Sequence, residues 1–277
     1  MKKKGFTLIE LLAVIVILAI IALIATPLVL KYIETSRKGA FKNSIESIER
    51  VLELKTMTGF VSRYPLEIDI KDLDLKNKDK LNGSVIIKKI SKSNYEFFYD
   101  INDGEYRIYG PKDSEVYKLD KTVKLKLKTA NGIIDDDNNF VYSFYESDGY
   151  SYAGISLSDY FDVENGTLEF QKSAVYNTNS TGAKIILKDK NNKVANVYSV
   201  IIFGDIDGDG WSSDVTDFGD TELYIVDKFF FDKNAKKAAD MNADNIVNQL
   251  DIDIMENTNA ALYIYNQITR TYEEIDY

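Results

Sequence analysis

Oxygen-bearing side chains recur at a regular spacing in two stretches of the last quarter of the chain. The stretch that begins at Asp240 has such side chains at loop positions one, three, five, nine and twelve, and its seventh residue can offer a backbone carbonyl. A hard cation such as Ca²⁺ prefers many oxygen ligands that converge from one tight turn. The spacing therefore predicts a calcium site, which we call the second loop. Its expected ligands are Asp240, Asn242, Asp244, Ile246 through its carbonyl, Asn248 and Asp251.

A similar stretch, which we call the first loop, begins at Asp205 but departs from this spacing near its end. Position twelve would be Thr216, whereas a one-residue insertion would put Asp214 and Asp217 in the ninth and twelfth roles. Asp220 is a third candidate if the loop is longer still. With the insertion, the expected ligands are Asp205, Asp207, Asp209, Trp211 through its carbonyl, Asp214 and Asp217.

The two loops also differ at the sixth position, where loops of this type carry glycine for a sharp turn. The first loop has Gly210 there, and the second loop has Asn245. Asparagine tolerates a left-handed backbone better than most residues, so we expect the second loop to keep its turn. Because it also keeps the regular length and ligand spacing, we expect the second loop to be the tighter site, although the first loop holds more carboxylates.

The loops begin 35 residues apart, each is closed by an aspartate, and an apolar helix is expected only after each loop, over residues 221–231 and 252–262. This arrangement, over residues 203–265, resembles the dockerin family. The resemblance implies two calcium ions. Dockerins bind cohesin modules through small hydroxylic residues late in each loop, and here only Thr216 fits, because Gln249 and Leu250 stand at the second place. Calcium as a clamp on the fold is therefore the safer inference, and a cohesin-like partner is left open.

The N-terminus contains a second group of residues with a chemical role. Three lysines and Gly5 precede an apolar run that extends to Leu30 and contains one charged residue, Glu10. As a helix, residues 6–30 would span about 37 Å, enough for the ~30 Å hydrocarbon core of a membrane, and the lysines should stay in the cytoplasm. A carboxylate in such a helix costs on the order of 2.5–3.5 kcal/mol and usually marks function. The alternative is an interfacial Glu10 that reaches headgroup water.

The lysines, Gly5, the segment Phe-Thr-Leu-Ile-Glu and the apolar helix after it are similar to the N-terminus of type IV pilins and pseudopilins, over about residues 1–57. The resemblance implies that a prepilin peptidase cleaves after Gly5 and that the new N-terminal Phe6 is N-methylated. It also implies that Glu10 meets the amino terminus of a neighbouring subunit in a filament, which offsets the cost of burying it. Pro27 stands where such helices are often kinked, because proline removes an intrahelical hydrogen bond.

The elements that would position these residues follow from the spacing of the apolar side chains. One helix is expected over residues 6–57, transmembrane over 6–30 and amphipathic after that. It would pack on an antiparallel meander over 84–109, which gives an α+β fold. Five further short strands are expected at 123–127, 140–144, 166–170, 183–187 and 194–203, in a small antiparallel sheet or sandwich. The expected organisation is a leader peptide (1–5), a pilin domain (6–110), a linker (111–121), a β-rich domain (122–203) and the dockerin-like module (204–265).

Composition narrows the function further. The chain has 277 residues, a net charge of −10, and neither cysteine nor histidine. This excludes disulfides, zinc sites built on Cys or His, and catalysis by thiol or imidazole groups. Residues 203–277 contain 17 acidic and 5 basic side chains. A segment of this charge would repel nucleic acid and calls for cations or a partner.

The leading hypothesis is a structural subunit of a type IV pilus, not an enzyme, that resides in the cell membrane before assembly and then in an extracellular pilus, with adhesion as one role of its exterior. Its expected partners are other pilin subunits, a prepilin peptidase and the membrane, and no nucleic acid. One alternative is a pseudopilin of a type II secretion or DNA-uptake system, which would share the same N-terminus. A membrane-anchored enzyme is less favoured because no paired-acid or Ser–Lys spacing stands out.

Overall fold

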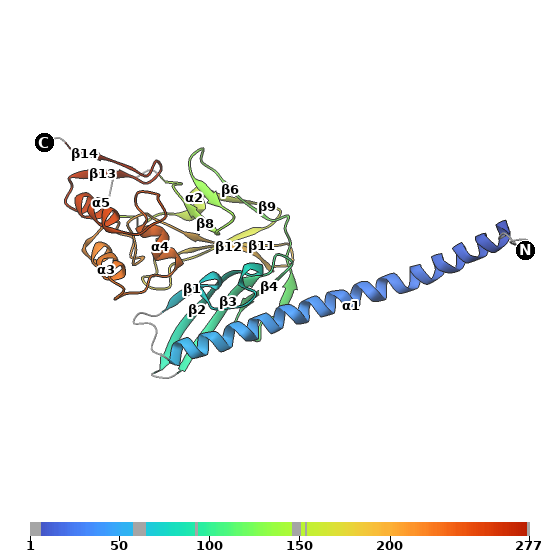
Figure 1. The fold of residues 1–277 in the computed structure, drawn as a ribbon. Helices are drawn as coiled ribbons and strands as arrows, with labels where there is room; N and C mark the ends of the chain where they lie inside the picture. Colours follow the sequence, from blue (N-terminus) through green and yellow to red (C-terminus); the bar gives the residue numbers. More distant parts are fainter. Residues whose placement is uncertain (1–6, 58–64, 92–93, 146–150, 153, 276–277) are drawn as a thin grey trace, which may run out of the picture. The chain divides into compact units, whose positions relative to one another are not determined.

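The computed structural model describes residues 7–57, 65–91, 94–145, 151–152 and 154–275. The chain divides into two compact units, Met1–Ser47 and Ile48–Tyr277. Among the described residues, the first unit consists of most of one helix, and the second unit contains the end of that helix and every strand (Figure 1). Both predicted loops therefore lie in the second unit.

A single helix, α1 (Leu8–Met57, 50 residues), forms the N-terminal part of the described chain. It continues through Pro27 as one ribbon (Figure 1), and the predicted start at Phe6 lies outside the described residues. The large apolar side chains from Leu8 to Leu30 are exposed. In the part of the chain that the structure describes, α1 is the one helix long and apolar enough to cross a membrane. Because an apolar surface this extensive marks an interaction site, this helix needs lipid or protein around it.

The second unit contains a five-stranded antiparallel sheet, which we call the head sheet, in the order β1-β2-β3-β4-β5. The predicted meander over 84–109 corresponds to β2, β3 and β4, and its antiparallel pairing confirms an α+β fold. The short 3₁₀ helices η1 (Ile70–Asp72) and η2 (Lys78–Lys80) lie between β1 and β2. The strands are β1 (Leu66–Asp69), β2 (Asn82–Ser91), β3 (Asn94–Asn102), β4 (Tyr106–Gly110) and β5 (Val116–Lys118).

The head sheet is larger than the sequence predicts. Strand β5 falls inside segment 111–121, which was expected to be a linker, and pairs with β4 from Val116 to Lys118. The sheet therefore ends at Lys118, and the boundary expected at Gly110 lies within it. A strand of three residues gives too little alternation of apolar and polar side chains to be recognised from sequence.

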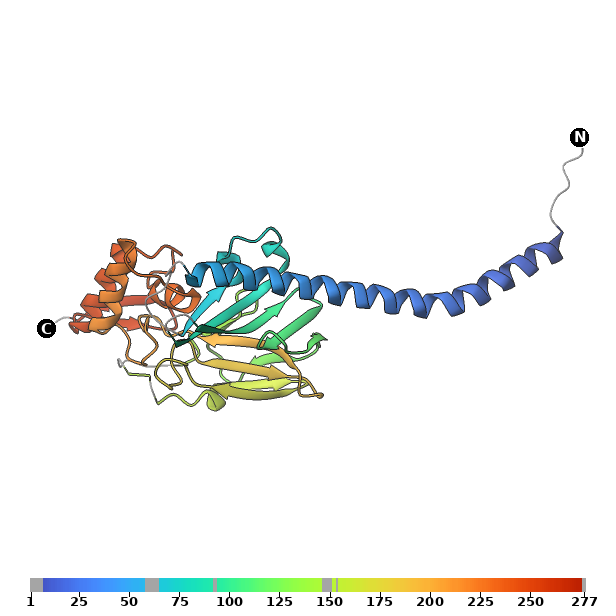
Figure 2. The same ribbon diagram turned by 90° about the horizontal axis from the view of Figure 1, so that it is seen from below.

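One face of the head sheet is aliphatic, because successive side chains of a strand point to opposite faces. The last turns of α1 belong to the second unit and lie over this face, as the view from below shows (Figure 2). Ile48 and Leu52 in these turns are fully buried, and Glu49 pairs with Lys112 at 2.6 Å. The aliphatic residues of this face are Leu66, Ile68, Val85, Ile87, Ile101 and Ile108, and the buried Tyr99 and Tyr106 lie on the same face.

The other face of the head sheet is polar and packs on a second sheet. Arg107 is buried on this face, where it pairs with Asp100 and donates a hydrogen bond of 3.1 Å to the carbonyl of Ala195. The hydroxyl of Tyr117 donates to the carbonyl of Val194 at 3.0 Å. The regions expected as a pilin domain and a β-rich domain are therefore joined within one compact unit.

This second sheet, which we call the central sheet, has the order β10-β11-β12-β8-β7. Four of its strands were predicted and β7 was not, while the fifth predicted strand, 123–127, corresponds to β6 outside this sheet. Strands β12 and β8 are parallel, so the sheet is mixed instead of antiparallel. A separate pair, β6 with β9, covers the core residues of the central sheet with Val123, Leu125 and Phe161. The elements of this region are β6 (Lys124–Leu127), β7 (Ile133–Asp135), β8 (Phe140–Tyr142), α2 (Leu157–Tyr160), β9 (Phe161–Glu164), β10 (Thr167–Gln171), β11 (Lys184–Lys188) and β12 (Val194–Val200).

The C-terminal part contains three helices and a hairpin, which gather at one end of the sheets in both views (Figures 1 and 2). Both predicted helices begin earlier than expected, so Asp217 and Asp251 lie in the first helical turns, where acidic residues are favoured. The helix α4 and the hairpin were not predicted from the sequence. The elements are α3 (Val215–Ile225), α4 (Lys233–Ala239), α5 (Gln249–Asn259), β13 (Tyr263–Asn266) and β14 (Thr271–Glu274).

The core of the C-terminal part is shared with the central sheet. Phe203, Met241 and Met255 pack in one cluster with Phe140 of β8 and with Ile201, directly after β12. Residues 204–265 therefore build most of this core and complete it with β8 and the residues that follow β12.

Candidate functional site

The first and second loops are closed by the same hydrogen bonds between side chains and backbone. The aspartate at position one accepts from the amide of position six in both: Asp205 from Gly210 at 3.1 Å, and Asp240 from Asn245 at 3.2 Å. Such bonds hold the carboxylates at the inside of a tight turn. The remaining equivalent pairs are Asp207 with the amide of Asp209, Asn242 with Asp244, Asp209 with Trp211, and Asp244 with Ile246.

The acid that closes each loop is defined by a capping box at the start of the next helix. In the second loop, Asn248 caps α5, and Asp251 accepts from the amides of Asn248 (3.0 Å) and Met241 (2.9 Å). In the first loop, Asp214 caps α3, and Asp217 accepts from the amides of Asp214 (3.0 Å) and Ile206 (2.7 Å). Asp217 thus takes the place of Asp251, with one extra residue in the first loop. Neither Thr216 nor Asp220 occupies that place.

Both loops have left-handed residues at positions four and six, and the first loop has one more at Ser213. Asn245 has φ of 65°, as the sequence predicts, and Gly210 has φ of 93°. At position four, Gly208 has φ of 81° and Ala243 has φ of 67°. A side chain at Gly208 would also meet the carbonyl oxygen of Thr181 at 2.7 Å. Glycine is therefore required in the first loop, whereas Ala243 bears conformational strain in the second.

The first loop gathers carboxylates in a buried position. One oxygen each from Asp205, Asp207 and Asp209 lies within 4.8 Å of the others, and Asp205 and Asp217 are fully buried. Without a cation, burial raises the pKa of Asp205 to about 7. Burial, and next the charge of Asp205, raise the pKa of Asp217 to about 9. A divalent cation has the opposite effect on these pKa values, because it stabilises the ionised carboxylates, which otherwise repel one another. The donor set therefore fits calcium.

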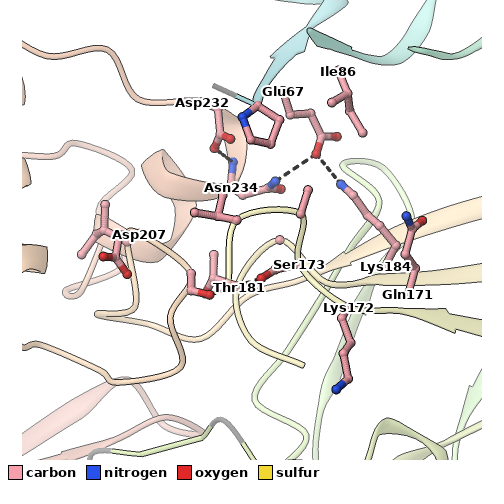
Figure 3. A pocket seen from close by; sticks show the side chains of 16 residues that line it. Glu67, Ile86, Gln171, Lys172, Ser173, Thr181, Lys184, Asp207, Asp232 and Asn234 are labelled. Carbon is pink, nitrogen blue, oxygen red and sulfur yellow. Dashed lines mark hydrogen bonds and ion pairs between the residues drawn. The ribbon is translucent and has the colours of Figure 1, made fainter. Parts of the chain in front are cut away.

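Residues 173–181, between β10 and β11, hold the first loop from outside, and we call them the hydroxyl segment. The amide of Thr181 donates to Asp205 at 2.9 Å, and the hydroxyl of Tyr176 donates to Asp207 at 3.0 Å. Thr181, Ser173 and Asp207 line one pocket in the close view (Figure 3). The carbonyl of Gly208 accepts from the hydroxyls of Ser173 (3.3 Å), Thr178 (3.1 Å) and Ser180 (2.6 Å).

The second loop has basic side chains where the first loop has hydroxyls. Asp240 pairs with Arg270 of the β13–β14 turn at 3.2 Å and with Lys237 of α4 at 3.5 Å. The guanidinium of Arg270 stacks 4.1 Å from the ring centre of Phe203. Burial raises the pKa of Asp251, as it does in the first loop. Two internal cations thus already face the carboxylate at position one.

The hydroxyl segment and Arg270 are functional residues that the sequence did not predict. A signal existed for the first, because residues 177–181 read Asn-Thr-Asn-Ser-Thr, a run rich in hydrogen-bonding side chains. No signal marked Arg270, which reaches Asp240 only because the hairpin returns to the loop.

The N-terminal site is an acid that caps its own helix. The amide and hydroxyl of Thr7 donate to the same carboxylate oxygen of Glu10, at 2.9 and 2.8 Å, and the amide of Glu10 points back to the hydroxyl of Thr7 at 3.4 Å. This is a capping box, and it directs the carboxylate toward the beginning of the chain. The processing residues Gly5 and Phe6 lie outside the described residues.

An exposed apolar helix with an acid in its first turn is long and apolar enough to cross a membrane. Residues 1–26 match the family model of the prokaryotic N-terminal methylation motif. This motif and the long apolar helix support a type IV pilin-like protein that is processed as a prepilin. No curated protein and no solved structure matches the chain.

Proposed function

We propose that the chain is a subunit of a type IV pilus, whose helix α1 enters the filament core after cleavage at Gly5, and whose second unit is displayed outside the cell with two bound calcium ions. The observation that carries the pilus part is the methylation motif over residues 1–26, followed directly by an exposed apolar helix that begins with Glu10. The role is structural, with adhesion as one use of the displayed unit.

The second candidate is a pseudopilin of a secretion or DNA-uptake system, because it would share the same N-terminal motif. A large displayed unit favours the pilus, since the 230 residues of Ile48–Tyr277 form one compact unit. Imaging of surface filaments labelled with an antibody to residues 111–275 separates the two, because a pseudopilus does not extend as a surface filament.

Processing and assembly are tested with two substitutions in the full chain. Gly5→Val should leave the precursor uncleaved in the membrane, as seen by its mass. Glu10→Ala should be cleaved at the normal rate but be absent from sheared filaments, because the neighbouring amino terminus loses its carboxylate partner. Glu34→Ala, at an exposed acid further along the same helix, is the control and should assemble normally. Incorporation of the Glu10 variant at the wild-type level would contradict the pairing role.

The calcium part of the proposal rests on the repeated ligand geometry. Asp205, Asp207, Asp209, the carbonyl of Trp211, Asp214 and Asp217 would hold one ion. Asp240, Asn242, Asp244, the carbonyl of Ile246, Asn248 and Asp251 would hold the other. When bound, each ion supplies positive charge that keeps buried carboxylates ionised. These residues in turn fix the first turns of α3 and α5, so the ions act as clamps on the fold.

The two sites are proposed to differ in the opposite sense from the sequence-based expectation. The first loop is the tighter site, because it has more carboxylates and its acids face hydroxyls and amides, whereas Asp240 faces Arg270 and Lys237. Even a weak site, in the 10⁻⁴–10⁻³ M range typical of extracellular modules, would be filled outside a cell. Calorimetric titration of the full chain in detergent with calcium should give two sites of unequal affinity. A single weak site, or none, would contradict the proposal.

A further inference from the structure

Three side chains of complementary reactivity converge at a buried point between the head sheet, the central sheet and α4. The carboxylate oxygen Oε2 of Glu67 accepts hydrogen bonds from Nζ of Lys184 and, at 3.1 Å, from Nδ2 of Asn234 (Figure 3). All three residues are more than nine-tenths buried. The amine and the amide therefore lie within two hydrogen-bond lengths of each other, because both donate to the same oxygen.

Each of the three side chains is fixed by its own element. Glu67 lies on the polar face of β1 and also accepts from the hydroxyl of Ser84 at 2.5 Å. Lys184 begins β11 and donates to the hydroxyl of Ser199 at 2.7 Å. These contacts hold the amine and the carboxylate in one orientation, so little conformational freedom remains to be lost in a reaction between them.

The backbone of Asn234 is fixed by a hydrogen bond, whereas its side-chain carbonyl has no hydrogen-bond partner. Asn234 is the second residue of α4, where its amide donates to the capping carboxylate of Asp232 at 2.8 Å. Its side-chain oxygen Oδ1 is buried and has no hydrogen-bond partner. An orphaned buried carbonyl destabilises the folded state and usually has an explanation. A covalent bond that has yet to form at the adjacent carbon, Cγ of Asn234, is such an explanation.

We propose that Lys184 and Asn234 are joined by an isopeptide bond that forms without another enzyme, with Glu67 as the proton carrier. Glu67 removes a proton from the ammonium group of Lys184, and the neutral amine attacks Cγ of Asn234. Glu67 then gives this proton to Nδ2 and takes the second proton from Nζ, the bond between Cγ and Nδ2 breaks, and the second proton leaves with the ammonia. The new bond is Nζ–Cγ, and one ammonia is released. No oxidant, reductant or cofactor is consumed.

The arrangement on Glu67 suits both halves of this reaction. Its Oε2 contacts the nitrogen that attacks and the nitrogen that leaves, so one atom can take the proton and deliver it. Burial limits the water that can solvate the charged groups and compete as a nucleophile. Ser84 and, at 3.6 Å, Lys233 contact the other oxygen, Oε1, so Oε2 is left to Lys184 and Asn234.

The bond would act as a covalent staple in a chain that has no cysteine. It would close a loop of 50 residues between β11 and α4, a loop that contains the whole first loop. Closing a loop restricts the unfolded chain and so favours the folded state. The expected consequence is a second unit that keeps the first loop in place even when calcium is removed.

Peptide mapping by mass spectrometry of the full chain, extracted in detergent and digested, tests the proposal directly. A cross-linked peptide that contains Lys184 and Asn234, lighter than its two parts by one ammonia, is the expected result. Finding only the two separate peptides in the wild-type protein would overturn the proposal and leave a buried ion pair. This measurement needs no variant to fold.

Substitutions then test which residues take part in the reaction. Glu67→Gln keeps the shape but cannot carry the proton, and Lys184→Arg keeps the charge but cannot form the bond, so both should lose at least nine-tenths of the cross-linked peptide. Lys233→Arg changes the other lysine at the same carboxylate and should leave the cross-link at the wild-type level. A cross-link that persists in Glu67→Gln would refute the role given to Glu67, and one that appears at Lys233 would refute the pair.

Discussion

The first loop and the second loop hold their carboxylates with the same backbone hydrogen bonds, and they differ in the charge of what surrounds them. In the first loop, Asp205 and Asp207 receive hydrogen bonds from the hydroxyl segment 173–181. In the second loop, Asp240 faces Arg270 and Lys237. The first loop therefore leaves its negative charge uncompensated, and the second loop neutralises part of its own.

This difference indicates that ligand spacing and ion affinity are set by different parts of the chain. The spacing of the ligands is a local property, since each loop and the first turn of its helix contain both partners of the hydrogen bonds that close the loop. The surrounding charge is contributed by residues far away in sequence, from β10–β11 for the first loop and from the β13–β14 turn for the second. A loop with regular spacing can thus be the weaker site.

The largest expected effect is on calcium affinity at the first loop. Asp205→Asn should weaken that site on the order of 100-fold, about 3 kcal/mol, because a buried anionic ligand is lost. Asp240→Asn should weaken the second loop by less, since Arg270 already offsets that charge. Trp211 is the single tryptophan and lies in the first loop, so its fluorescence reports that loop, and calorimetry reports both. An equal loss of calcium affinity in the two variants would contradict the proposed difference between the loops.

A smaller effect is expected when pH is varied in the presence of a chelator. The folded-state pKa values of Asp205 (about 7) and Asp217 (about 9) exceed the ordinary value of 3.8. Between pH 4 and 9 the folded state therefore binds protons that the unfolded state has lost, so the free energy of unfolding falls as pH rises. We expect the Tm of the metal-free chain to drop by roughly 5 °C from pH 5 to pH 8. Excess calcium should remove that slope, and Asp217→Asn should reduce it more than Asp251→Asn.

Substitutions at the fourth position of the two loops should change the stability of the second unit in opposite directions. Gly208→Ala should destabilise the second unit by about 2 kcal/mol, because φ is positive and the new Cβ meets the carbonyl of Thr181. Ala243→Gly should stabilise it by up to about 1 kcal/mol, because it relieves a left-handed alanine. Chemical denaturation in calcium measures both. Two changes of the same sign would show that the loops are not equivalent at this position.

The smallest effect is expected when the internal cations of the second loop are removed. Lys237→Gln leaves Asp240 with Arg270 alone, and calcium affinity of the second loop should rise roughly fivefold, about 1 kcal/mol. The first loop should not respond, so Trp211 fluorescence serves as the internal control. Calcium affinity that is unchanged, or weaker, would show that Lys237 does not compete with the ion.

The elements could be predicted from sequence where one period or one motif defines them. The apolar run defines α1, and alternation defines β2, β3 and most strands of the central sheet. Turn chemistry defined the left-handed Asn245. Strand β5 is too short, and the starts of α3 and α5 were placed too late because Asp217 and Asp251 look like loop ligands and also act as capping residues. The parallel pairing of β12 with β8, the hydroxyl segment and Arg270 depend on contacts between distant residues, which no local pattern contains.

Several contacts of the second unit join its beginning to its end. Glu67 meets Lys184 and Asn234, which follow it by 117 and 167 residues, and Ser143 bonds Gln267, 124 residues later. Contacts at such separations form late in folding, since long loops must close first. Because a chain is made from its N-terminus, these distant partners of β1 are synthesised last. Until they arrive, the polar face of the head sheet stays uncovered, so a prematurely ended chain cannot complete the unit and remains open to proteases.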